Sequence, residues 1–201
     1  MSTRGLIGFR YKEKDKLAYN HFDSSPDMLG QKILKELHDV KDWDAVRERI
    51  GSLHSIPETR RLDEYSSMAE TEIRRHFPNL EYRTEPKTFY DLYRPLQGTL
   101  KPYLSGELMF MPDASDFIYN SLHCDWAYIA NLDESLFEIW KGRQTKPDND
   151  ENRYGQDQDR MGYYPCSKLI GYDLNKLPDP VSFMADYQLY QDISSEGKRY
   201  S

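Results

Sequence analysis

The sequence predicts an α+β fold in which layers of antiparallel sheet pack against helices, and an αββα sandwich is one arrangement that fits. Strand-like runs occur near both ends of the chain, whereas helical spacing of apolar residues occupies the part between them. With 201 residues, of which 38% are hydrophobic, the chain is long enough to bury a core. We therefore expect a single domain over residues 1–201.

The first element expected is a β-hairpin. Residues 3–11 and 17–22 are apolar-rich runs separated by the charged residues 12–16. A turn centred on Lys14 and Asp15 would place Arg10 opposite Tyr19. Because side chains alternate between the faces of a strand, one face is mostly apolar and should pack on the core: Thr3, Ile7, Phe9, Ala18, Asn20 and Phe22. The other face carries the groups capable of chemistry: Ser2, Arg4, Leu6, Arg10, Tyr19, His21 and Asp23.

Four helices are expected after the hairpin. The first begins at residues 25–27, where Ser is the N-cap, Pro takes the first helical position and Asp lies in the first turn, and its apolar stripe runs to Leu37. A second helix follows Asp42, a third covers 60–76, and a short one covers 88–96.

The C-terminal half predicts a second hairpin and one more strand. Residues 125–132 and 136–140 alternate in hydrophobicity around a polar turn, and 168–174 is a further strand. Residues 143–162 are polar without periodicity, which is typical of a long mobile loop, and we expect 191–201 to be a frayed tail.

Charge and composition disfavour several classes of partner. The net charge is −7 and the pI about 5.3, whereas binding to nucleic acid phosphates needs clustered Lys and Arg. No apolar run is long enough for a membrane span, and the N-terminus lacks a secretory signal. We expect a soluble cytoplasmic protein that binds neither nucleic acid nor membrane; the sequence does not predict its oligomeric state.

The strongest hypothesis for catalysis concerns the second residue, Ser2. Because serine is small, removal of Met1 is expected to leave Ser2 with a free amine beside its own hydroxyl, and that amine can act as the general base. Neighbouring groups on the hairpin would complete a site. The catalytic residues expected are Ser2, Asn20 and Asp23; the substrate-binding residues expected are Arg4, Tyr19 and His21.

This opening resembles that of N-terminal nucleophile hydrolases of the choloylglycine-hydrolase and penicillin-acylase kind. The resemblance rests on Ser2-Thr3, the hairpin and the segment 19–23, Tyr-Asn-His-Phe-Asp. It implies an αββα sandwich that cleaves non-peptide amide bonds. The chain differs in having Ser2 for Cys, Tyr19 for Arg, and one more residue between Asn and Asp. The whole chain is also similar to a group of uncharacterised proteins that open Thr-Arg-Gly and carry Tyr-Asn-His-x-Asp-Ser.

A non-catalytic protein is the competing interpretation. The face that carries Arg4, His21 and Asp23, together with surface tyrosines, could bind a small ligand or a protein partner. Asn20 and Asp23 are also ordinary turn and cap residues before a helix. The expected partner is therefore either a small amide substrate or another protein.

Other clusters favour structural roles. His123 and Cys124 are neighbours in an extended segment and point to opposite faces, so Cys124 is expected to be a partly buried cysteine at the start of a strand and not a nucleophile. Cys166 could approach Cys124 if their strands are adjacent. The remaining Cys and His residues lack metal-ligand spacing and no nucleotide fingerprint is present, so we expect no metal and no cofactor.

Overall fold

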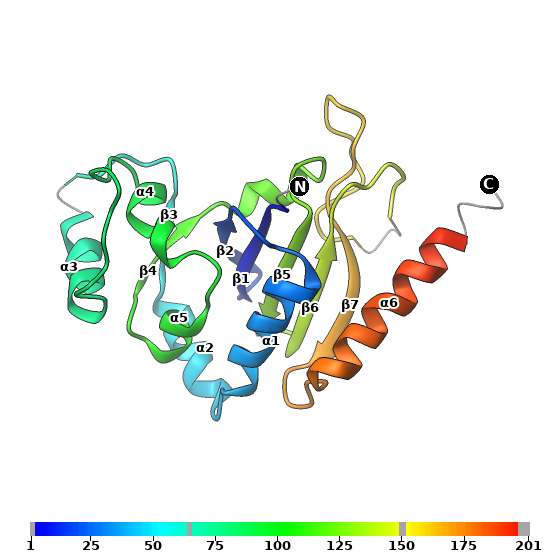
Figure 1. The fold of residues 1–201 in the computed structure, drawn as a ribbon, viewed down its shortest axis with the longest axis horizontal. Coiled ribbons are helices and arrows are strands. Elements are labelled where there is room, and N and C mark those ends of the chain that lie inside the picture. The colour runs from blue at the N-terminus through cyan, green and yellow to red at the C-terminus, as the bar shows by residue number, and fades with distance from the viewer. Residues whose placement is uncertain (1–2, 64–65, 149–151, 197–201) are drawn as a thin grey trace.

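A computed structural model describes residues 3–63, 66–148 and 152–196, and it confirms the α+β class. Five strands form the main sheet in the order β2-β1-β5-β6-β7 (Figure 1). Their bounds are β1 Gly5–Tyr11, β2 Lys14–Asn20, β5 Trp126–Asn131, β6 Leu136–Lys141 and β7 Ser167–Asp173. Both hairpins and the strand near residue 170 therefore form close to where the sequence predicts them.

The first hairpin turns earlier than predicted. Its two-residue turn consists of Lys12 and Glu13, which both adopt left-handed backbone angles, with φ of 52° and 59°. Arg10 consequently pairs with Asp15 and not with Tyr19, so the predicted register was wrong. The shift is an even number of residues, and the side chains within the two strands therefore keep their predicted faces.

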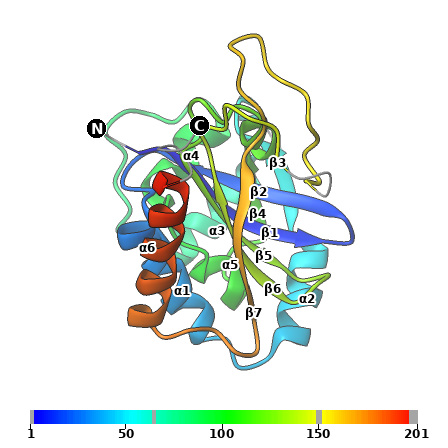
Figure 2. The same ribbon diagram turned by 90° about the vertical axis from the view of Figure 1, so that its right-hand side faces the viewer.

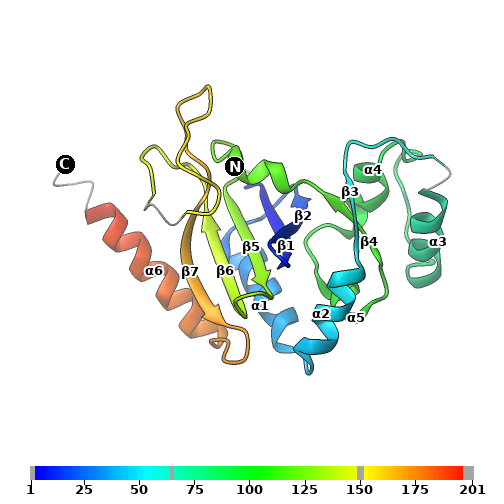
Figure 3. The same cartoon turned by 180° about the vertical axis from the view of Figure 1, so that it is seen from behind.

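The main sheet is mixed, not purely antiparallel. β1 pairs in parallel with β5, whereas the other neighbouring strands are antiparallel. A second sheet consists of two short parallel strands, β3 (His54–Pro57) and β4 (Phe110–Asp113). These strands lie beside β2 (Figure 3). Within the described residues no second sheet covers a face of the main sheet, which corrects the expectation of an αββα sandwich.

Helices cover one face of the main sheet. Figure 2 shows α1 and α6 on one side of the sheet and the segment after β6 on the other. The four predicted helical regions form, although the third begins at residue 66 instead of 60. The helices are η1 Pro26–Gly30, α1 Gln31–His38, α2 Trp43–Ser52, α3 Ser66–His76, α4 Phe89–Tyr93, η2 Arg94–Leu96, α5 Lys101–Ser105, η3 Ser115–Tyr119 and α6 Pro180–Glu196. Helix α6 extends to residue 196, inside the region expected to be frayed, and residues 197–201 lie outside the described part.

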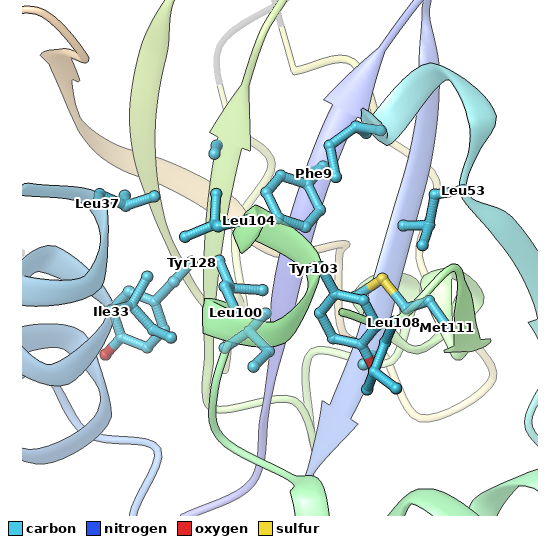
Figure 4. Packing of buried hydrophobic residues seen from close by; sticks show 14 of the residues in the cluster. Phe9, Ile33, Leu37, Leu53, Leu100, Tyr103, Leu104, Leu108, Met111 and Tyr128 are labelled. Carbon is cyan, nitrogen blue, oxygen red and sulfur yellow. The ribbon is translucent and has the colours of Figure 1, made fainter. Parts of the chain in front are cut away.

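The larger core joins the helices to both sheets. Phe9 of β1, Tyr128 of β5 and Ile33 of α1 are buried and face the same interior (Figure 4). The same cluster includes Phe110 and Met111 of the small sheet. Ile7, Phe9 and Ala18 of the predicted apolar face therefore pack on a core, as expected, whereas Phe22, beyond the end of β2, is exposed and the prediction for it was wrong.

An irregular segment, residues 142–166, closes the second face of the sheet, and we call it the covering segment. It includes an isolated bridge between Gln144 and Tyr164 but otherwise no strand or helix among its described residues. Tyr154 is buried against Leu6 and Trp140. Although the sequence predicted a mobile loop over residues 143–162, Asn152 and Tyr154 within it are buried; residues 149–151 lie outside the described part.

A buried ion pair fastens the covering segment to the sheet. Arg153 donates to both carboxylate oxygens of Glu138, at 2.8 and 2.6 Å, and its guanidinium stacks on Trp140. Glu138 is fully buried and also accepts from Asn131 and from the Trp140 indole, each at 2.9 Å. Burial alone would raise the pKa of Glu138, but the hydrogen bonds and charge of Arg153 outweigh it and lower that pKa.

Candidate functional site

The carboxyl ends of three strands, β2, β3 and β4, meet at one end of the molecule, where the predicted site residues of the first hairpin also lie. The backbone N–H of Glu58, just after β3, donates to the carbonyl of Asp113 at the end of β4 (3.1 Å). The N–H of Ala114 donates to the carbonyl of Leu17 in β2 (2.8 Å). The carboxyl ends of β2, β3 and β4 therefore lie close to the amino end of β1, near the N-terminus marked in Figure 1.

Tyr19 is at the centre of this region. Its hydroxyl lies 3.0 Å from Nδ1 of His21, and its ring packs edge-on against Phe117, with 5.2 Å between the ring centres. The ring of Tyr90 lies 6.1 Å away. Burial raises the pKa of the Tyr19 hydroxyl, and the charge and hydrogen bond of Arg4 oppose this only in part. Tyr19 is therefore neutral at pH 7 and can donate a proton in a hydrogen bond.

Two neighbouring groups act on this hydroxyl. The guanidinium of Arg4 is near enough for its positive charge to do so. The hydroxyl also shares a hydrogen bond with Nδ1 of His21, whose direction depends on which ring nitrogen carries the proton. The backbone N–H of His21 also donates to the side chain of Gln97 at 3.2 Å. The position of the histidine is thus fixed through both its main chain and its ring.

A cleft of about 450 Å³ opens next to this group. Its walls come from the ends of β3 and β4 and from η3, and they include Glu58, Asp113, Phe117 and Asn120. This volume is within the range typical of sites for small ligands.

Glu58 lies between the cleft and a second, nearly closed cavity. That smaller cavity has a volume of about 10 Å³ and is also lined by Tyr19 and Tyr90, so it has room for one water molecule. Burial, followed by the nearby charge of Asp113, raises the pKa of Glu58. The side chain of Asp113 is fixed by the backbone N–H and hydroxyl of Ser115, at 2.9 and 2.6 Å. A carboxyl group with a raised pKa in a cleft keeps its proton to a higher pH than an ordinary carboxyl group, which is a common property of functional sites.

The other predicted site residues lie elsewhere. β2 ends at Asn20, whose buried amide donates to the carbonyl of Phe22 (2.5 Å) and the hydroxyl of Ser24 (2.8 Å). This turn carries Asp23 out of the strand, with φ of +53° and an exposed side chain. Asp23 and Asn20 line a separate hollow next to Met28. The structure therefore brings Arg4, Tyr19 and His21 together and separates them from Asp23; Ser2 lies outside the described residues.

Sequence reasoning missed Glu58, Tyr90 and Phe117. All three come from the middle of the chain and reach the hairpin only through the pairing of β3 with β4 and the packing of η3. The local signal that exists is the capping box of Thr88 and Asp91, which places Tyr90 in the first turn of α4.

The cysteines behave as the sequence suggested. His123 is exposed whereas Cys124 is fully buried, and its thiol donates to the carbonyl of Trp126 at 3.6 Å. Cys166 does lie next to Cys124. Across residues 3–63, 66–148 and 152–196, no three His, Cys, Asp or Glu side chains are grouped as metal ligands would be. In the same part of the chain no helix is both long and apolar enough to cross a membrane.

Comparisons with known proteins give no match: no family model, no curated protein and no solved structure matches this chain. The function must therefore be argued from the geometry of the site.

Proposed function

We propose that this protein hydrolyses non-peptide amide bonds, with Ser2 as the nucleophile after removal of Met1. One observation carries the proposal. β1 begins at Gly5, three residues after Ser2, at the end of the sheet where Arg4, Tyr19 and His21 gather beside the cleft. A nucleophile at the chain terminus would thus start from a rigid strand next to polar groups and a space for substrate.

The proposed reaction has two steps. The α-amine of Ser2 takes the proton of its own hydroxyl, the oxygen attacks the amide carbonyl carbon, and the C–N bond breaks as that proton passes to the leaving nitrogen. A water molecule then attacks the ester on Ser2, returns a proton to the serine oxygen and releases the acid. Nothing besides water is consumed.

Arg4 and Tyr19 would bind the substrate. In the family that the opening resembles, an arginine stands at the position of Tyr19; here Arg4 brings a guanidinium to the Tyr19 hydroxyl from the neighbouring strand. That pair suits the negative charge of a substrate carboxylate or of the developing oxyanion. His21 orients the tyrosine. Asn20 acts as a positioning residue through the turn that it closes, and the exposed Asp23 is assigned no step.

The substrate would be a small amide, because the cleft has the volume of a small-molecule site. We place the enzyme in the cytoplasm, where the reducing environment would keep the thiols of Cys124 and Cys166 free, as they are in this structure.

The alternative is a binding protein without catalysis. Two exposed apolar side chains favour it: Phe22 is 56% and Met28 55% exposed, and both border the hollow next to Asp23. Such side chains are common where a partner binds. Binding of this kind needs no free amine at Ser2.

One experiment distinguishes the amide hydrolase from the binding protein. The wild type, Ser2→Ala and Ser52→Ala would be assayed against a panel of chromogenic anilides of carboxylic acids. Alanine at position 2 still permits removal of Met1, and Ser52 is an exposed serine in α2 that serves as the control. We expect hydrolysis that falls at least about 100-fold in Ser2→Ala and is unchanged in Ser52→Ala. Equal hydrolysis by all three proteins would exclude Ser2 as the nucleophile, and no hydrolysis by any of them would favour the binding protein.

A further inference from the structure

Cys124 and Cys166 lie side by side beneath the covering segment. Cys124 comes shortly before β5 and Cys166 directly before β7, and both side chains are completely buried. The Cys166 thiol donates to the carbonyl of Cys124 (3.7 Å), the Cys124 thiol donates to the carbonyl of Trp126 (3.6 Å), and both side chains belong to one buried cluster. The described part of the chain contains two cysteines, and these two lie next to each other.

The backbones on both sides are held independently of the sulfur atoms. The N–H of Cys124 donates to the carbonyl of Asn120 (2.9 Å), and the N–H of Cys166 donates to the carbonyl of Ile118 (3.0 Å). The side-chain amide of Asn152 donates to the carbonyl of Cys166 at 3.1 Å. The closeness of the thiols is therefore a property of the fold and does not depend on a bond between them.

We propose that Cys124 and Cys166 are a modification site, at which a peroxide converts the two thiols into an internal disulfide that fastens the covering segment to the start of β5. One thiolate attacks the peroxide, water leaves and a sulfenic acid forms. The second thiol attacks that sulfur, the S–S bond forms and a second water leaves. Two thiols are oxidised and one hydrogen peroxide is reduced to two water molecules.

Burial sets the condition for this reaction. Contact with Cys166 and burial raise the pKa of the Cys124 thiol, so the closed protein holds it as the unreactive thiol. Oxidant can reach the pair only when the covering segment opens. Its described residues form no helix and no strand, so local opening there is expected to cost less than global unfolding. The disulfide should then form at the rate of opening and prevent the next opening.

The test uses the full-length reduced protein and hydrogen peroxide. Samples are oxidised with and without a urea concentration below the unfolding transition, then unfolded, alkylated with N-ethylmaleimide and weighed by mass spectrometry. We expect monomeric protein that has lost both alkylation sites, a cross-linked peptide containing Cys124 and Cys166, and faster reaction in urea. The oxidised protein should unfold about 5–10 °C higher than the reduced protein.

Cys124→Ser and Cys166→Ser provide the controls, since neither can form the internal bond and neither should gain thermal stability from peroxide. Because a serine at either position could impair folding, the masses of the oxidised and alkylated wild-type protein are sufficient by themselves to test the proposal. Two free thiols after oxidation in urea, sulfinic acid on either cysteine, or disulfide-linked dimers would overturn the proposal.

Discussion

The hydroxyl of Tyr19 lies 3.0 Å from Nδ1 of His21, two residues further along the same chain. The positive charge of Arg4 also acts on this hydroxyl. Residues i and i+2 of a strand share a face, so the hairpin itself produces this arrangement.

Removal of the Tyr19 hydroxyl should therefore disturb the site without disturbing the core. We expect Tyr19→Phe to lower kcat/KM for an anilide substrate by about 10–100-fold, because His21 loses its hydrogen-bond partner and the hydroxyl beside Arg4 is removed. The exposed Tyr119 gives the matched control, and Tyr119→Phe should have no effect. Unchanged hydrolysis in Tyr19→Phe would remove the tyrosine from the mechanism.

Glu58 should make stability depend on pH. Its folded pKa is raised, so its contribution is fully present below the ordinary value of 4.5 and is lost as the pH rises through the folded pKa. Glu58→Gln, which cannot ionise, should have nearly the wild-type melting temperature at pH 4 and a higher one at pH 8. Thermal unfolding across this range checks the prediction, and parallel curves for the two proteins would contradict it.

Removal of only one charge of the ion pair between Glu138 and Arg153 should strongly lower the free energy of unfolding. Glu138→Gln leaves the guanidinium inside the protein without its counter-charge, which costs about 3–5 kcal/mol in such pairs. The double variant Glu138→Met/Arg153→Met should cost clearly less, because no charge remains buried. Urea unfolding at pH 7 measures both.

The sign of the pH dependence follows from the lowered pKa of Glu138. Its contribution is present above the ordinary value of 4.5 and is lost as the pH falls through the folded pKa. The difference between wild type and Glu138→Gln should thus shrink below about pH 4.5. A constant difference down to pH 3 would show that the charge of Glu138 does not stabilise the fold.

The first hairpin offers a stabilising change. Lys12 and Glu13 hold left-handed angles that Asn and Gly adopt more readily, so Lys12→Asn/Glu13→Gly should stabilise the protein by about 1 kcal/mol. Both backbone N–H groups donate to the carboxylate of Asp133, at 2.7 and 2.9 Å, and the variant keeps these bonds. Asp133→Ala should destabilise instead. A destabilised double variant in chemical unfolding would show that these side chains make contacts that outweigh the backbone preference.

Local patterns predicted much of the fold. Asp42 caps α2, as expected, and its carboxylate accepts from the N–H groups of Asp44 and Ala45. The hairpin of β5 and β6 follows from alternation alone. At the first described residue of the third helix, the N–H and hydroxyl of Ser66 donate to the carboxylate of Asp63.

Other elements lacked a readable pattern. β3 and β4 have four residues each and contain proline, which disfavours strand prediction, and they form by pairing across more than fifty residues. In α6 the apolar residues do not form one stripe: Val181 is 79% exposed whereas Phe183 is buried. A capping signal was nevertheless present, since Asp179 accepts from the N–H groups of residues 181 and 182.

The candidate site also combines residues whose positions the sequence could predict with residues whose positions it could not. Arg4, Tyr19 and His21 are close in sequence and share a face by strand periodicity, so the sequence could place them together. The turn after Asn20 ended that periodicity and displaced Asp23, which strand periodicity alone could not show. Glu58 joins the site only through tertiary pairing.

The central claim is that Ser2 acts through its own free amine. The intact mass of the protein, purified from a cell that processes N-termini normally, tests this most directly. The account predicts the mass of a chain that begins at Ser2 with no acetyl group. A chain that retains Met1, or one that carries an acetyl group on Ser2, would contradict the proposed nucleophile and leave a binding protein as the better description.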